Sequence, residues 1–250
     1  MASKATKVSD PNAKGSSGFL WAVGVLLVIV AVVIGFIVWK GQGAKTEALG
    51  DMPTEETSMS MEYADNAVVL KAADAKKDAT EVELYEDYSC PHCGELAIAS
   101  DGDMKTAIEE GKLIVHVRTL NFLDGRDIEG NTGHSTKAAA AMEQIAKAGD
   151  VKTYWNLRKY LMENQQEVAN QWSFEDFADA AKQLGADDSL VDSIKNVDIK
   201  NGNKLAKFNY DKLEKDTGSV SSPRIIKDGK DFPEEGSGKS IMEWVSLITA

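Results

Sequence analysis

The chain has almost no cysteine: two of its 250 residues are Cys, and both lie in the stretch YEDYSCPHCGE. A zinc site needs four ligands, and no second cysteine pair exists to complete one with Cys90 and Cys93. Two of the three histidines, His116 and His134, are not at ligand spacing. Haem attachment requires a histidine directly after the second cysteine, where Gly94 stands instead. A redox disulfide is therefore the leading interpretation, ahead of a metal site.

Basic residues are also few: 28 Lys and Arg stand against 40 Asp and Glu, a formal net charge of −12 at pH 7. Because nucleic acid would meet mostly like charge, and no basic patch is present, we expect no nucleic-acid partner. The acidic composition instead predicts a soluble surface that keeps the folded domain monomeric. No internal repeat is visible.

One long apolar run is present, FLWAVGVLLVIVAVVIGFIVW at residues 19–39. As a helix it would be about 31 Å long, which matches the hydrocarbon thickness of a bilayer. The apolar part of a signal peptide is shorter, roughly 7 to 15 residues, and precedes a small-residue cleavage site. Here the run ends in Trp39 and Lys40. We therefore predict a single, uncleaved transmembrane helix.

The charges that flank this run predict its orientation. Three lysines precede the run, whereas four acidic residues dilute Lys40 and Lys45 after it. By the positive-inside rule, residues 1–18 form a cytoplasmic tail, and everything after Lys40 lies outside the plasma membrane. Residues 40–64 are rich in Gly, Ser, Thr and Glu and are expected to form a flexible stalk, followed by a folded domain over 65–250.

Periodicity in the domain predicts an α/β fold with a mixed sheet. Alternating or continuous apolar residues predict strands, and i, i+3, i+4 spacing predicts helices. Ser173 with Asp176 is typical of a helix start, and Asp228-Gly229 of a hairpin turn. We expect strands at 67–70, 81–86 and 112–120, a helix from the cysteines to Gly111 kinked near Asp101, an all-helical insertion at about 130–200, a helix at 203–216, a hairpin and a C-terminal helix over 239–249.

The predicted position of the cysteines favours redox chemistry. A thiol at a helix N-terminus faces unpaired N–H groups and the positive end of the helix dipole, which favour its thiolate. Pro91 suits the first helical turn, and His92 can add positive charge or a hydrogen bond. Each unit by which the Cys90 pKa falls stabilises the reduced form by about 1.36 kcal/mol. We expect Cys90, at the exposed start of the turn, to exchange with substrate, and buried Cys93 to be its internal partner.

The stretches VELYEDYSCPHCGE and GSVSSPRIIKDG, with the helical insertion between them, resemble the DsbA-like branch of the thioredoxin superfamily. The similarity covers about 65 to 250 and points to the membrane-anchored disulfide-forming oxidases of Gram-positive actinobacteria. It implies a thioredoxin-like fold in which Pro223 is a cis-proline opposite the Cys90–Cys93 disulfide. It also implies that the Ser222 backbone holds a substrate peptide in extended form, and that no cofactor is needed beyond the disulfide.

The same resemblance implies two kinds of partner: unfolded exported proteins with cysteine pairs, and a quinone-linked membrane protein, DsbB-like or VKOR-like, that renews the disulfide. The sequence departs from the family in two places. Leu84 stands where relatives often have a buried acid, with Glu83 and Glu86 nearby but expected to face differently. Arg224 follows the proline where an uncharged residue is common, and is expected to alter substrate preference. His116 and His134 match no functional position of the family, and we interpret both as structural.

The leading hypothesis is therefore an extracytoplasmic thiol oxidase that acts through Cys90 and Cys93. A reductase or isomerase of the cell envelope remains an alternative, although no dimerisation module precedes the first strand. A copper-binding carrier that uses the same two sulfurs, and a noncatalytic peptide-binding module, are further alternatives.

Overall fold

The computed structural model describes residues 21–33, 47–50 and 54–250. The chain divides into two units, Met1–Gly43 and Ala44–Ala250. In the first unit, residues 21–33 are helical; the rest of the predicted 19–39 span and the predicted cytoplasmic tail lie outside the described residues. A search of those described stretches finds no helix with both the length and the apolar character needed to cross a bilayer.

The second unit is built on one six-stranded sheet with the strand order β1-β2-β4-β3-β5-β6. The central neighbours β3 and β4 are parallel, and the other neighbouring pairs are antiparallel. A parallel pair needs a crossover connection, which α3 (Pro91–Glu109) provides. The strands are β1 (Met59–Ala64), β2 (Ala67–Ala72), β3 (Thr80–Asp87), β4 (Leu113–Leu120), β5 (Arg224–Lys227) and β6 (Lys230–Asp231).

Helices cover both faces of the sheet, as expected of an α/β domain. Successive residues of β3 point to opposite faces. Val82 and Leu84 join the main core together with Leu96 of α3, whereas Tyr85 joins a second cluster with Leu213 of α9 (Ile199–Thr217). The cysteines, at the start of α3, therefore lie on the main-core side of the sheet.

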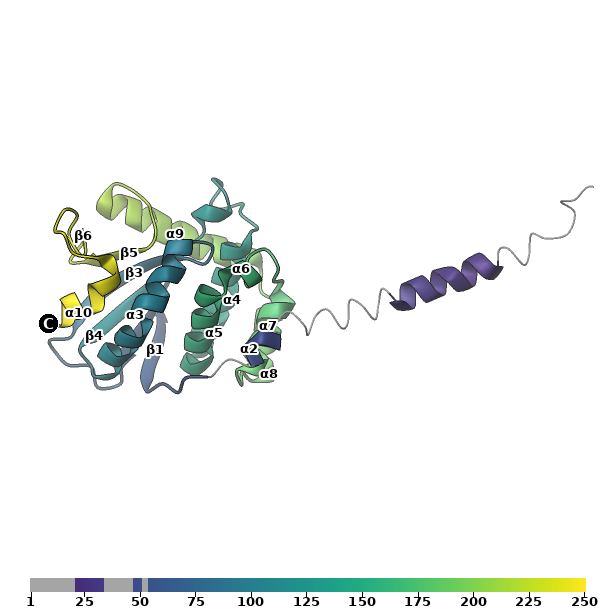
Figure 1. Ribbon diagram of the computed structural model, residues 1–250, viewed down its shortest axis with the longest axis horizontal. Coiled ribbons are helices and arrows are strands. Elements are labelled where there is room, and N and C mark those ends of the chain that lie inside the picture. The colour runs from purple at the N-terminus through teal and green to yellow at the C-terminus, as the bar shows by residue number, and fades with distance from the viewer. Residues whose placement is uncertain (1–20, 34–46, 51–53) are drawn as a thin grey trace, which may run out of the picture. The chain divides into compact units, whose positions relative to one another are not determined.

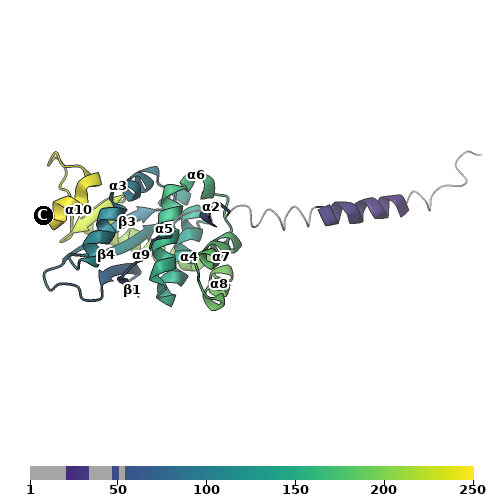
Figure 2. The same ribbon diagram turned by 60° about the horizontal axis from the view of Figure 1, so that its bottom comes forward.

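An all-helical block connects β4 to α9, in agreement with the predicted insertion. In both views, α4 to α8 gather at one end of this unit and the C-terminal helix lies at the other (Figures 1 and 2). The block follows η1 (Phe122–Asp124) and consists of α4 (His134–Ala148), α5 (Val151–Glu163), α6 (Gln165–Val168), α7 (Phe174–Gln183) and α8 (Asp188–Lys195).

Four local expectations can be compared with the structure. The capping box of Ser173 and Asp176 is present at the start of α7. The Asp228-Gly229 turn is present, with both residues in the left-handed region that such turns require. α3 runs without interruption through Asp101, where a kink was expected. The C-terminal helix is shorter than expected: it consists of η2 (Ile241–Glu243) and α10 (Trp244–Thr249).

The predicted stalk is wrong at its C-terminal end, since residues 59–64 form β1, paired along its length with β2. The preceding residues are also fastened to the domain. The Glu55 N–H donates to Asn156 Oδ1 at 2.7 Å, and the indole of Trp155 donates to Glu55 Oε2 at 2.9 Å. Further back, α2 (Glu47–Gly50) buries Leu49 to 2% exposure. The folded domain therefore begins well before residue 65.

Candidate active site

Cys90 occupies the N-cap of α3, with Pro91 at the first helical position. β3 ends at Asp87, so the strand delivers Cys90 to the edge of the sheet after two intervening residues. Proline is favoured here because its missing N–H would have no partner in the first turn of a helix. The expected strand-to-helix placement of Cys90 is therefore present. Cys90 is not exposed as expected, because only 5% of its surface is accessible to solvent.

The two thiols are free and differ strongly in acidity. A hydrogen bond from the Cys93 thiol lowers the pKa of Cys90 to about 5, with further lowering by Ser222 and the backbone N–H groups of Cys93 and His92, against the opposing effect of burial. Burial raises the pKa of Cys93 well above its ordinary value, and hydrogen bonding to Cys90 raises it further. Negative charge is therefore held on Cys90, while Cys93 remains a protonated donor.

The ring of His92 is turned to solvent rather than towards the sulfurs. Its side chain is 74% exposed, and its Nδ1 lies 2.9 Å from Glu95 Oε2. That hydrogen bond raises the pKa of His92, with a smaller contribution from the charge of Cys90. The hydrogen bond that residue 92 gives to Cys90 comes from its backbone N–H, and not from the imidazole that was expected to supply it.

Ser222 and Pro223, which approach the cysteines from far along the chain, directly precede β5. The peptide bond between them is cis, as the family resemblance implied. The Sγ atom of Cys90 lies 3.4 Å from the carbonyl oxygen of Ser222. Pro223 also lines a small enclosed gap beside Cys93. The structure therefore brings together all six predicted site residues: Cys90, Pro91, His92, Cys93, Ser222 and Pro223.

The helical insertion reaches the start of α3 through a close approach at Gly94. A Cβ atom on Gly94 would lie 2.7 Å from the carbonyl oxygen of Met162, so only glycine allows this spacing. Gln165, just beyond Met162, donates from Nε2 to the carbonyl oxygen of Cys90 at 2.9 Å. The backbone of the first cysteine is therefore held by the insertion as well as by its own helix.

A buried ion triad lies next to Cys93. Arg158 of α5 donates to Glu86 of β3 at 2.6 Å and to Asp101 of α3 at 2.7 Å, and each of the three residues is at most 5% exposed. The enclosed gap that these side chains share with Cys93 and Leu84 is too small to hold a water molecule. Burial raises the pKa of Asp101 to about 6. The expectation that Glu86 faces away is wrong: two residues after Leu84 on a strand, it points to the same face.

The guanidinium of Arg224 is held by contacts within the protein. Its Nε donates to Asp231 Oδ1 at 2.7 Å, and a second nitrogen binds the other carboxylate oxygen at 2.5 Å. Its remaining contacts go to Thr217 and Ser219 at the end of α9. The guanidinium is therefore occupied within the protein. Its expected influence on substrate preference stays a prediction.

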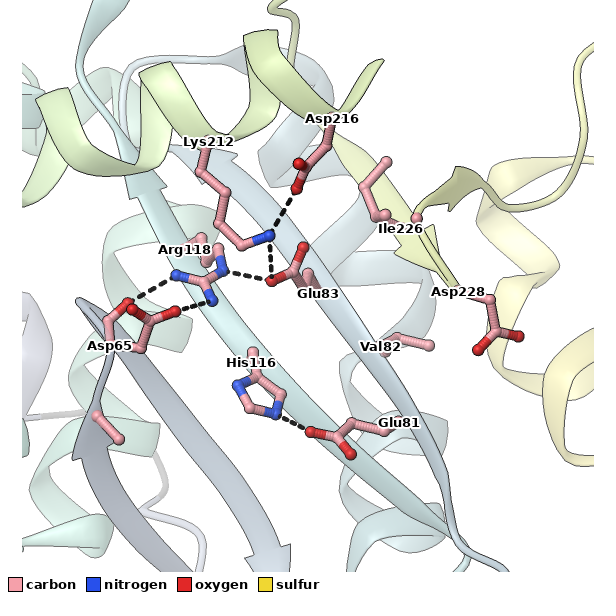
Figure 3. A pocket seen from close by; sticks show the side chains of 12 residues that line it. Asp65, Glu81, Val82, Glu83, His116, Arg118, Lys212, Asp216, Ile226 and Asp228 are labelled. Carbon is pink, nitrogen blue, oxygen red and sulfur yellow. Dashed lines mark hydrogen bonds and ion pairs between the residues drawn. The ribbon is translucent and has the colours of Figure 1, made fainter.

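A separate polar pocket of about 370 Å³ lies on the α9 side of the sheet (Figure 3). There Arg118 donates to Glu83 at 2.8 Å and to Asp65 at 3.0 Å, and His116 lies 2.5 Å from Glu81 (Figure 3). The cysteines do not line this pocket. His116 is paired with Glu81 there, and Lys212 contacts both Glu83 and Asp216, which agrees with a structural role for His116.

His134 is also buried within the protein, at 1% exposure, and stacks on Phe177 with ring centroids 6.0 Å apart. Neither ring nitrogen has a hydrogen-bond partner among the described residues. Burial lowers the pKa of His134 to about 4, so the ring is neutral at pH 7. Its position in the core fits the structural interpretation.

Sequence reasoning missed two contributions to the site, Gln165 and the triad around Arg158. Gln165 lies 75 positions from Cys90, and Arg158 lies 72 positions from Glu86. One signal was available: Glu86 alternates with Leu84 and Val82 along a strand, which places a charged residue on the core face. Such a charge requires a buried partner of opposite sign.

Comparisons with known proteins agree with this geometry. The thioredoxin family model matches residues 72–247. MdbA, a thiol-disulfide oxidoreductase from Corynebacterium diphtheriae, is 45% identical, with a TM-score of 0.74 over 81% of this chain and 99% of MdbA. MdbA from Corynebacterium matruchotii is 39% identical, with a TM-score of 0.73 over 82% of this chain and 98% of that protein. DsbA from Mycobacterium tuberculosis shares the fold. It is 18% identical, with a TM-score of 0.52 over 72% of this chain and 92% of the DsbA chain.

Among curated proteins, the chain is similar to the serine/threonine-protein kinase PknE of Mycobacterium tuberculosis. The two are 25% identical over 161 residues, which is 63% of this chain. The chain spans only 27% of the length of that kinase.

One assignment follows from the family match, the two MdbA structures and the paired thiols at the start of α3. This chain belongs to the thioredoxin superfamily, as a DsbA-like protein thiol-disulfide oxidoreductase.

Proposed function

We propose that the chain introduces disulfide bonds into unfolded exported proteins, by exchange through its Cys-Pro-His-Cys motif. The observation that carries this proposal is the unequal acidity of the two thiols: the pKa of Cys90 is lowered to about 5, chiefly by the Cys93 hydrogen bond. A pair whose reduced form contains a stabilised thiolate gives up its disulfide readily. The protein therefore acts as an oxidant toward its substrate.

The exchange takes place in two steps. A substrate thiolate attacks Cys90 Sγ, the Cys90–Cys93 bond breaks, and Cys93 leaves with the electron pair and then takes up a proton, as its raised pKa favours. The second substrate thiolate attacks the substrate sulfur of the mixed disulfide, and Cys90 leaves as a stabilised thiolate. The substrate loses two electrons and gains a disulfide; the enzyme gains the two electrons as a dithiol.

The surroundings of Cys90 offer room for an extended substrate chain. A hollow of about 350 Å³ opens beside Pro91, with Ile98 on its wall at 66% exposure. A second hollow, of about 390 Å³, lies against Pro223. The backbone of Ser222, beside the Cys90 sulfur, would pair with the substrate chain.

The oxidised enzyme must be regenerated after each turnover. A quinone-linked membrane protein, DsbB-like or VKOR-like, is our proposal for the partner that accepts the two electrons. We place the oxidoreductase domain outside the plasma membrane, anchored through the apolar run at 19–39, because this run and its flanking charges fit such an anchor. There it would meet exported chains before they fold.

The decisive experiment uses a reduced, unfolded protein with two cysteines. Cys90→Ser and Cys93→Ser should each abolish its oxidation, because neither variant can form the Cys90–Cys93 disulfide that accepts the two electrons. Undiminished oxidation by Cys90→Ser would overturn the proposal. Measuring the reduction potential distinguishes the alternative of a reductase: a value near that of thioredoxin, about −270 mV, would favour it, whereas an oxidase should approach the DsbA value of about −120 mV.

A further inference from the structure

Asp87, three residues before Cys90, fixes the loop that presents the first cysteine. Its side chain is 0% exposed. Its carbonyl oxygen accepts the N–H of Cys90 at 2.9 Å, which closes a β-turn over residues 87–90. Its Oδ1 accepts the N–H of Ser89, also at 2.9 Å. An aspartate that bonds its own backbone two residues on is a common means of holding a turn.

The same carboxylate is bound from the side of the helical insertion. Ser135, the second residue of α4, donates its hydroxyl to Asp87 Oδ1. The Ser135 hydroxyl also lies 2.7 Å from that of Ser89, and the Leu123 N–H donates to Asp87 Oδ2 at 3.2 Å. Three segments of the chain therefore meet on one buried carboxylate: the loop before Cys90, η1 and the start of α4.

Asp87 also contacts the second cysteine. Its backbone N–H lies 3.5 Å from Cys93 Sγ. One residue thus contacts the backbone at Cys90 and the sulfur of Cys93. Burying a carboxylate is costly unless it is well bonded, and the bonds to Asp87 join the redox loop to η1 and to the start of α4. A turn on the protein surface would need no such burial.

We propose that Asp87, acting with Ser89 and Ser135, is a positioning residue for the redox pair. It holds Cys90 so that its sulfur stays near the backbone N–H groups of His92 and Cys93, where negative charge is stabilised, and 3.4 Å from the carbonyl oxygen of Ser222. This inference rests on the proposed exchange at Cys90 and adds the residues that keep that thiol in its acidic environment. Loosening the turn should therefore make Cys90 less acidic and its disulfide less oxidising.

The test compares Asp87→Asn and Ser135→Ala with the control Asp150→Asn, in the full-length protein. Asp150 caps α5 through the Thr153 N–H and is not among the residues that surround the cysteines. For each variant, three quantities are measured: the pH midpoint of Cys90 thiolate absorbance, the equilibrium constant with glutathione, and the denaturant midpoint of unfolding. Ser135→Ala, which loosens the turn and keeps its charge, should move the Cys90 midpoint to higher pH. Asp87→Asn should move it in the same direction, because loosening the turn outweighs the opposite effect of losing a nearby negative charge.

Each unit of that shift should reduce the equilibrium constant for substrate oxidation about tenfold, so the two measurements must change together. Asp150→Asn should lower the unfolding midpoint and leave both redox quantities at the wild-type value. The inference would be overturned if folded Asp87→Asn and Ser135→Ala kept the wild-type titration midpoint and glutathione equilibrium constant. It would also be overturned if Asp150→Asn changed these two quantities equally. If Asp87→Asn does not fold, Ser135→Ala and Ser89→Ala decide it. Failure of the wild-type protein to oxidise any substrate would refute the proposed function. It would not decide the role of Asp87, because the titration of Cys90 and the equilibrium with glutathione can be measured without a protein substrate.

Discussion

The acidity of Cys90 should depend on a hydrogen-bond donor at residue 93. The hydrogen bond from Cys93 is the largest single cause of the lowered Cys90 pKa. Replacing Cys93 by alanine removes this donor, whereas serine retains one of similar size. A hydrogen bond to a charged group contributes about 1.5 to 3 kcal/mol, and each pKa unit corresponds to about 1.36 kcal/mol. Cys93→Ala should therefore raise the Cys90 pKa by about one to two units relative to Cys93→Ser.

The assay is the ultraviolet absorbance of the thiolate as a function of pH, which reports Cys90 alone because it is the sole remaining cysteine in both variants. The serine variant should titrate near the value in the intact pair, about 5. Identical midpoints for the two variants would refute the reasoning, because the low pKa would then arise from the helix terminus and Ser222 without help from residue 93. Alkylation rates at a fixed pH provide an independent measure of the same thiolate population.

Three further predictions concern stability. Arg158→Met leaves two buried carboxylates unpaired, so it should lower the free energy of unfolding by about 3 to 5 kcal/mol in urea titrations. The control Arg126→Met changes an exposed residue and should alter this free energy little. Equal losses in the two variants would contradict the role of the triad. Gly94→Ala should reduce both stability and substrate oxidation, because its Cβ would meet the Met162 carbonyl at 2.7 Å, and full activity would rule out that close approach. His134 has a folded pKa of about 4, below its ordinary 6.5, so the folded state binds fewer protons than the unfolded one. Stability should thus be complete above about pH 6.5 and fall by about 3 kcal/mol towards pH 4, and His134→Phe should remove that part of the acid sensitivity seen by calorimetry.

The features that the sequence predicted well are those written in local patterns. The alternation of Val82 and Leu84 predicted β3, and Pro91 after Cys90 predicted the helix start, because strand period and first-turn chemistry involve neighbours in the chain. The contacts that complete the site arise between distant segments. No local pattern connects Gln165 to the carbonyl of Cys90, and only the packing of the insertion against α3 brings them together.

The error at the stalk has a similar cause. The segment MSMEYA alternates weakly, because β1 is an edge strand with several half-exposed side chains. Its stability comes from pairing with β2 and from the helices that pack on it, neither of which a single segment reveals. The expected exposure of Cys90 was wrong for the same reason: the sequence places the thiol at a helix start, but Ser222, 132 positions away, lies against it.

The contacts that Leu49, Glu55 and β1 make with the rest of the domain determine how this enzyme can be produced without its N-terminal segment. A version cut at residue 65 would lack an entire strand and expose the edge of β2 to pairing with other molecules. The indole of Trp155 and the amide of Asn156, both buried, would lose the Glu55 groups that they bind. A shortened protein intended for assays or crystals should therefore begin ahead of Leu49.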